Sequence, residues 1–149
     1  MKEFHLITVG KLKDKHLEAI EADYLKRIKN PKLILHEVKA SADHPETEAK
    51  NVIKKVETLS SDSKMILLTE FGTEYDSQKF SRWLSTEIQN HCLIFVVCGA
   101  QGPSSALKEK AHFQLSLSAL TLPHKLARIL LVEQLYRAQT IREGHPYHN

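Results

Sequence analysis

The stretch Ser116-Leu-Ser-Ala-Leu-Thr-Leu-Pro-His124, with the residues that follow it to the end of the chain, decides the fold. Polar and apolar residues alternate up to Leu120, which predicts the last strand of a sheet. Pro123 then stands at the start of a helical pattern that runs from Lys125 to Glu143, and Gly144 ends it. A strand, a short apolar loop, a helix and an aromatic, imidazole-bearing tail therefore follow one another without a break.

Upstream of this stretch, strands and helices are predicted to alternate. The expected strands are Phe4–Val9, Leu33–Val38, Met65–Thr69, Leu93–Val97 and Phe113–Ala119, of which the third breaks at Glu70-Phe71-Gly72. Helices are expected from Asp14 to about Ile28, from Pro45, from Asp76 or Ser77, and from about Ser104. The first helix is predicted to bury Leu17, Ile20, Tyr24 and Ile28. This alternation predicts an α/β fold with helices on both faces of the sheet.

Length and composition narrow the class of protein. A chain of 149 residues, 42% hydrophobic and 26% charged, is expected to fold as one soluble domain, and its apolar runs are too short to cross a membrane. The N-terminus reads as a first strand, with no signal-peptide cleavage site. Cys92 and Cys98 fit neither a metal spacing nor a disulfide framework, so we expect a reducing cytoplasm. The net charge of +3 permits an anionic partner without requiring one.

Three loops follow the carboxyl ends of strands, where ligands bind in open parallel sheets. They are Leu68–Gly72, Cys98–Pro103 and Leu120–His124. Gly99 and Gly102 allow a close backbone approach to a ligand, or they are turn glycines only. Leu120–His124 offers main-chain groups in an apolar setting that suits a flat heterocycle such as adenine, or it is simply the entry to the helix.

The last helix and the tail each leave two interpretations open. The helix is apolar on more than one side, which indicates either a subunit interface or a deeply buried core helix. His124 and Arg128 share one face near its start, which suits a nucleotide or anionic partner. Alternatively, His124 is partly buried and bonded to backbone, and Arg128 faces solvent or forms a salt bridge. In the tail, His145, Tyr147 and His148 offer proton-transfer and stacking groups, or they are incidental.

Several of these segments resemble one known family. Ser116–His124, Arg128, Val132-Glu-Gln-Leu-Tyr-Arg-Ala138 and Gly144-His-Pro-Tyr-His148 are similar to the bacterial 23S ribosomal RNA pseudouridine N3-methyltransferases of the SPOUT class. Leu6–Lys11 and Tyr24–Arg27 extend the resemblance, so that it spans the whole chain. It implies a single SPOUT methyltransferase domain over residues 1–149, whose α/β sheet ends in a C-terminal trefoil knot. Such knots are rare exceptions to ordinary chain topology.

The resemblance also implies a cofactor, partners and site residues. S-adenosylmethionine would bind the knot loops, at positions that match Leu68, Gly99, Ser118, Ala119, Leu120, Thr121, Leu122 and Pro123. A homodimer would complete each active site with the partner's tail, and Arg128, Tyr147 and His148 would face the RNA of the large ribosomal subunit, within the assembled ribosome. Cys98 departs from the family, which usually has glycine there, so we expect a cofactor loop of slightly different shape that still binds through Gly99.

The resulting hypothesis is transfer of a methyl group from S-adenosylmethionine to N3 of a pseudouridine in 23S RNA, without a metal. His148 would accept the N3 proton or order a water, Tyr147 would hold the base, and Arg128 would contact the RNA. Lysines of the first loop and helix would contact phosphates, or they are a solvated helix face. The alternatives are a non-catalytic RNA- or ribosome-binding module of the same fold, and a nucleotide-binding α/β enzyme of other chemistry.

Overall fold

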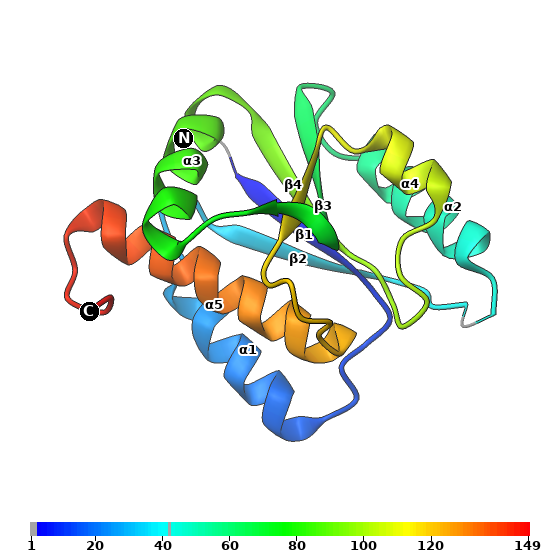
Figure 1. The fold of residues 1–149 in the computed structure, drawn as a ribbon, viewed down its shortest axis with the longest axis horizontal. Helices are drawn as coiled ribbons and strands as arrows, with labels where there is room; N and C mark the ends of the chain where they lie inside the picture. The colour runs from blue at the N-terminus through cyan, green and yellow to red at the C-terminus, as the bar shows by residue number, and fades with distance from the viewer. Residues whose placement is uncertain (1–2, 42) are drawn as a thin grey trace.

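A computed structural model describes residues 3–41 and 43–149, in which strands and helices alternate as predicted (Figure 1). The strands are β1 (Phe4–Val9), β2 (Leu33–Val38), β3 (Ser63–Glu74), β4 (Cys92–Val97) and β5 (Phe113–Ser116). The helices are α1 (Lys15–Arg27), α2 (Pro45–Glu57), α3 (Ser77–Asn90), α4 (Ser105–Lys110) and α5 (His124–Glu143). β3 is longer than predicted, and β5 ends at Ser116 instead of Ala119.

The strands form one sheet in the order β2-β1-β4-β3-β5, and each neighbouring pair is parallel. β4 lies in the middle and is buried along its whole length, which confirms the central parallel strand predicted from its continuous apolar run. Because the strands are parallel, their carboxyl ends and the loops that follow them share one edge of the sheet.

Helices cover both faces of the sheet, as predicted. α1, α3 and α5 pack on one face and α2 and α4 on the other, and the two groups lie on opposite sides of the strands in Figure 1. α5 lies between α1 and α3 and contributes Leu131, Val132 and Leu135 to the larger core cluster. Leu126 and Leu130, on its other side, remain 45% and 43% exposed. The helix is therefore both a core helix and an uncovered apolar surface.

The helix ends follow the predicted chemistry, whereas one helix face does not. The side chains of Asp14, Asp76 and Ser104 cap α1, α3 and α4 by accepting backbone N–H groups. The prediction that α1 buries Ile20 is wrong, because Ile20 is 44% exposed while the neighbouring Glu21 is 5% exposed. Glu21 is turned inward because it binds a buried arginine of α5. A long-range ion pair thus sets the rotation of this helix, which apolar periodicity could not reveal.

The end of β3 crosses over β5. Leu115 of β5 is the register partner of both Leu68 and Thr73, so β3 pairs with it on both sides of the irregularity at residues 69–72. At Leu115, each edge of β5 can pair with only one neighbouring segment. Leu68 pairs with one edge of β5, so Thr73 approaches the other edge. In Figure 1 the green end of β3 crosses the gold β5 before the chain continues to α3. Threading of the C-terminal segment stays a prediction, and this crossing supports it.

The crossing makes Gly72 a point of backbone contact. A Cβ at Gly72 would lie 2.6 Å from the backbone carbon and oxygen of Gln114, closer than atoms approach one another. We expect Gly72→Ala to lower the free energy of unfolding by about 3 kcal/mol, because backbone atoms and not a flexible side chain must move. Chemical denaturation would measure this change. Gly99→Ala is the matched control, since its Cβ would meet atoms no closer than 3.5 Å, and an equal loss in both variants would contradict the crossing geometry.

Candidate cofactor cavity and C-terminal tail

The three loops singled out in the sequence meet around one cavity of about 770 Å³ at the carboxyl edge of the sheet. Residues of Leu68–Phe71, Val97–Pro103 and Leu117–His124 line it, together with Lys108 and Ala127. The volume lies within the range of about 300–1,000 Å³ typical of small-molecule sites. The apolar side chains of Phe71 and Leu120 are 81% and 75% exposed at this cavity, so they are available to a flat ligand.

The predicted cofactor positions gather here. All of them except Ala119 line the cavity, although they come from three separate loops. Local contacts fix the third loop: Ser118 Oγ accepts the backbone N–H of Leu120, and the Thr121 hydroxyl donates to the Glu70 carboxylate at 2.5 Å. The second of these bonds joins the loop after β5 to the segment that crosses it. Contact of these residues with a cofactor stays a prediction.

Cys98, which stands where the family usually has glycine, does not place an ionised thiol in the cavity. Its side chain packs in the core cluster between the sheet and α2 and α4. Burial, with a smaller contribution from the Glu48 carboxylate, raises the pKa of the Cys98 thiol to about 12. The thiol therefore stays neutral at physiological pH. The glycine next to it, Gly99, remains at the cavity wall.

Arg128 forms a salt bridge, the alternative that the sequence left open beside an RNA contact. Its side chain is 5% exposed, and it donates from Nε and Nη2 to the two carboxylate oxygens of Glu21, at 2.6 and 2.8 Å. Nη2 also donates to Glu37 at 2.9 Å, and Nη1 donates to the carbonyl of Gly10 at 3.4 Å. The guanidinium thus joins α5 to α1, β2 and the loop after β1. In this arrangement it is not available to an RNA phosphate.

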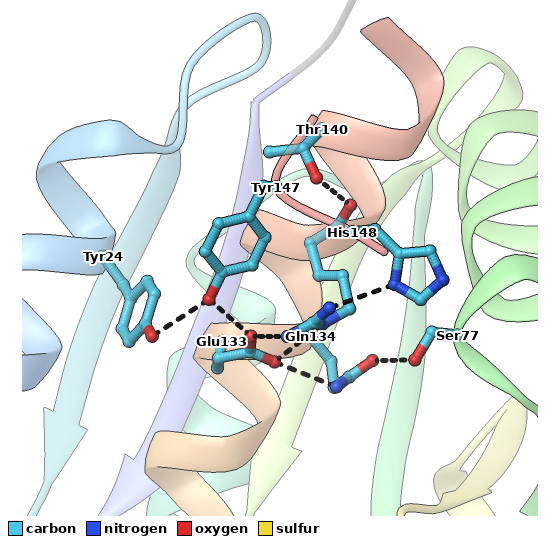
Figure 2. A network of polar contacts seen from close by, with 8 residues as sticks. Tyr24, Ser77, Glu133, Gln134, Thr140, Tyr147 and His148 are labelled. Atoms are coloured by element: carbon cyan, nitrogen blue, oxygen red, sulfur yellow. Dashed lines mark hydrogen bonds and ion pairs between the residues drawn. The ribbon is translucent and has the colours of Figure 1, made fainter. Parts of the chain in front are cut away.

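The C-terminal tail folds back on the middle of α5. Tyr147 donates its hydroxyl to Glu133 at 2.7 Å, and it lies 3.2 Å from the hydroxyl of Tyr24 on α1 (Figure 2). Its ring packs edge-on against Tyr136, with ring centroids 4.8 Å apart. Burial and these hydrogen bonds raise the pKa of Tyr147 above that of an ordinary phenol. Tyr147 therefore remains a neutral hydrogen-bond donor, and Tyr24 must in turn donate to it.

His148 is held by the same helix. Arg137 Nη1 lies 3.0 Å from His148 Nδ1, and Arg137 also donates to both carboxylate oxygens of Glu133, at 3.3 and 2.7 Å (Figure 2). Glu133 and Arg137 lie at i, i+4 on α5 and form an ion pair at 2.7 Å. Spacing alone could not show that the tail returns to this pair.

The tail and the cavity lie at different positions along α5. Ala127 lines the cavity, whereas Arg137 contacts His148. These residues are ten positions apart, which is about 15 Å along a helix. Within one chain, the tail as docked does not line the cavity.

Among residues 3–41 and 43–149, no helix has the length and hydropathy needed to span a membrane. Within the same residues, no three His, Cys, Asp or Glu side chains gather into a metal-binding group.

Known proteins resemble this chain along its whole length. A family model described as "Predicted SPOUT methyltransferase" matches residues 1–148. A "Ribosomal RNA large subunit methyltransferase H" of Prochlorococcus marinus is 43% identical over 145 residues, which is 97% of this chain and 95% of that protein. The protein of the same name from Acholeplasma laidlawii is 37% identical over 145 residues, covering 96% of this chain and 97% of that protein.

Solved structures show the same fold at lower identity. A probable methylase family protein from Haemophilus influenzae has a TM-score of 0.56 at 14% identity, covering 95% of this chain and 66% of that chain. The SpoU methyltransferase AviRb from Streptomyces viridochromogenes, solved in complex with AdoMet, has a TM-score of 0.53 at 11% identity, covering 93% of this chain and 59% of that chain. At these identities the likeness is one of fold.

Proposed function

The chain belongs to the SPOUT methyltransferase family, and on that premise we propose that it transfers a methyl group from S-adenosylmethionine to N3 of a pseudouridine in 23S ribosomal RNA. The observation that carries the proposal is the cavity built by the three loops at the carboxyl edge of the sheet. It suits a nucleoside cofactor in size, and the exposed side chains of Phe71 and Leu120 offer apolar surface to an adenine ring. The names of the relatives point to RNA of the large ribosomal subunit as the substrate.

The cofactor supplies the reactive methyl group, and the protein supplies binding and orientation. Leu68, Gly99 and the loop Ser118–Pro123 would hold S-adenosylmethionine. The Glu70–Thr121 hydrogen bond keeps two of the three loops together before the cofactor arrives. Because this bond holds the two loops together, we expect little ordering of them on cofactor binding.

We further propose that the active site is shared between two copies of the chain. The reacting nitrogen must approach the methyl carbon to about 3–3.5 Å, whereas the docked tail of one chain lies well along α5 from its own cavity. A partner subunit's tail could supply Tyr147 and His148 to that cavity. The exposed Leu126 and Leu130 of α5 and Ile20 of α1 offer an apolar surface for such a homodimer.

Cofactor and substrate tests separate this function from its alternatives. We expect isothermal titration calorimetry to show binding of S-adenosylmethionine, and mass spectrometry of 23S RNA to show one added methyl group at a pseudouridine. The protein would act in the cytoplasm, where ribosomal particles are available, so free RNA and assembled ribosomes should both be supplied. Absence of binding at millimolar cofactor would refute the assignment, and binding without methylation of either substrate would favour a non-catalytic RNA-binding module.

A further inference from the structure

The contact between Arg137 and His148 fixes which nitrogen of the imidazole carries hydrogen. A guanidinium has five N–H donors and no acceptor, and it stays charged in proteins. Arg137 Nη1 lies 3.0 Å from His148 Nδ1, so Nδ1 must accept this hydrogen bond with its lone pair. A neutral imidazole protonated at only one nitrogen then has its hydrogen on Nε2. Nε2–H is a donor on the side of the ring away from Arg137.

The surrounding contacts hold Arg137 in place for this purpose. Both carboxylate oxygens of Glu133 accept from it, and its guanidinium carbon lies 4.8 Å from the centre of the Tyr147 ring. Tyr147 is itself bonded to Glu133, so arginine, carboxylate and phenol form one connected group, and the imidazole joins this group through Arg137 (Figure 2). Chain ends are usually frayed. Here the last residues are fixed by charged and aromatic partners on α5.

We propose that His148 acts in the methyl transfer as a hydrogen-bond donor, through Nε2–H, to a carbonyl oxygen next to N3 of the base, and that Arg137 is the positioning residue that keeps the imidazole in this tautomer. The proposal rests on the function proposed above. It replaces the idea that His148 accepts the N3 proton, because in this arrangement one ring nitrogen bears hydrogen and the lone pair of the other is occupied.

The donor role gives a balanced reaction. The N3 proton passes to solvent water, and the electron pair left on N3 is delocalised onto the carbonyl oxygens at C2 and C4. Nε2–H stabilises that negative charge, as oxyanion-hole donors do in acyl transfer. N3 then forms a bond to the methyl carbon, and the S–CH₃ bond breaks with its electron pair going to sulfur. The sulfonium becomes a neutral thioether, so no metal or further reactant is required.

The tautomer can be measured without any assay of activity. Long-range ¹H–¹⁵N correlation spectra of uniformly labelled protein distinguish protonated from unprotonated imidazole nitrogens, and the His148→Asn spectrum identifies the signals of this residue. We expect hydrogen on Nε2 at neutral pH in the wild type, and loss of that preference in Arg137→Met. Arg142→Met is the control, since Arg142 lies on the same helix but donates to the carbonyl of Asn30. Hydrogen on Nδ1 in the wild type would overturn the proposal.

Two amide substitutions test the catalytic role. His148→Gln places an amide N–H near the position of Nε2–H, whereas His148→Asn has no donor at that reach, and neither amide is a base. We expect His148→Asn to lower kcat by about 10²–10³-fold, as removal of an oxyanion donor does, and His148→Gln to be at least roughly tenfold faster than His148→Asn. Arg137→Lys, which keeps a donor, should be faster than Arg137→Met.

The outcomes separate this proposal from the one on which it rests. If wild-type protein methylates 23S RNA but the Gln and Asn variants are equally inactive with cofactor affinity intact, His148 acts as a base and the donor role is refuted. If the wild type has no methyltransferase activity, the proposed function fails, while the spectra still decide the tautomer. Equal activity of all His148 variants would show that the imidazole takes no part.

Discussion

Replacing Arg128 with methionine is expected to lower the free energy of unfolding by about 3–5 kcal/mol, a large fraction of the stability of a domain of this size. Methionine fills much of the same space, so the loss comes from charge. Glu21 is 5% exposed and would be left with an unpaired carboxylate, and Glu37 would lose the same partner. Urea denaturation followed by circular dichroism would measure the change. The RNA-contacting role expected from the sequence predicts instead a loss of activity with unchanged stability.

Two further variants separate the ion pair from general damage to the fold. Arg82→Met removes an exposed arginine from α3 and should change stability by no more than about 0.5 kcal/mol. Adding Glu21→Gln to Arg128→Met should restore part of the lost stability, because it removes the buried charge that the first substitution left unpaired. Losses that simply add in the double variant would contradict this account. A stable Arg128→Met protein that no longer binds RNA would support the RNA-contacting role expected from the sequence.

Arg128 illustrates what the sequence could not show. Its position on one face with His124 was readable from helical spacing, but its partners lie 107 and 91 positions away. No local pattern links Glu21 to α5, and for the same reason apolar periodicity assigned Ile20 to the buried face of α1. Sequence patterns predict the local geometry of a helix or strand. A buried ion pair between helices depends instead on which helices pack side by side on the sheet.

The cavity was predictable because it follows from topology. Once the strands are known to be parallel, the loops after β3, β4 and β5 must share one edge, so their residues converge there. The extent of β3 was not predictable. Glu70-Phe71-Gly72 reads as the end of a strand, yet the chain continues across β5 and pairs again at Thr73. The need for glycine at position 72 becomes clear only from the structure, in which the backbone of Gln114 lies too close for a Cβ.

The position of the C-terminal tail was also not predictable from the sequence. The sequence shows which functional groups the tail carries at Pro146, Tyr147 and His148. It does not show where they lie, since a chain end can lie anywhere its linker reaches. The structure supplies the partners, namely Glu133 and Arg137 of α5 and Tyr24 of α1. These partners set the tail at a distance from the cavity in the same chain. This separation is the physical reason to expect that catalysis needs a second subunit.

Deleting Tyr147–Asn149 is accordingly expected to lower turnover by at least about a hundredfold while leaving the affinity for S-adenosylmethionine nearly unchanged. The deletion removes the donor and stacking groups that would face the base, but it removes nothing from the lining of the cavity. Methylation of 23S RNA and calorimetry measure the two quantities separately. His145→Ala is the matched control, because it alters the tail upstream of the removed segment. Unchanged turnover would refute a role for the tail, and lost cofactor binding would mean that the deletion had damaged the fold.

A mixing experiment then decides whether the tail acts in its own subunit or in the partner. The tail-deleted protein is mixed with a second protein that carries Ser118→Trp. This substitution is designed to fill the cavity, and calorimetry must first show that it abolishes cofactor binding. Neither protein alone should methylate RNA. If the site is shared, a mixed dimer has one complete site, formed by the intact cavity of the tail-deleted chain and the intact tail of the other. Random exchange makes about half of the dimers mixed, so activity should return to roughly a quarter of the wild-type value. A tail that serves its own cavity predicts no recovery, because in that arrangement every site in the mixture lacks one of its two parts.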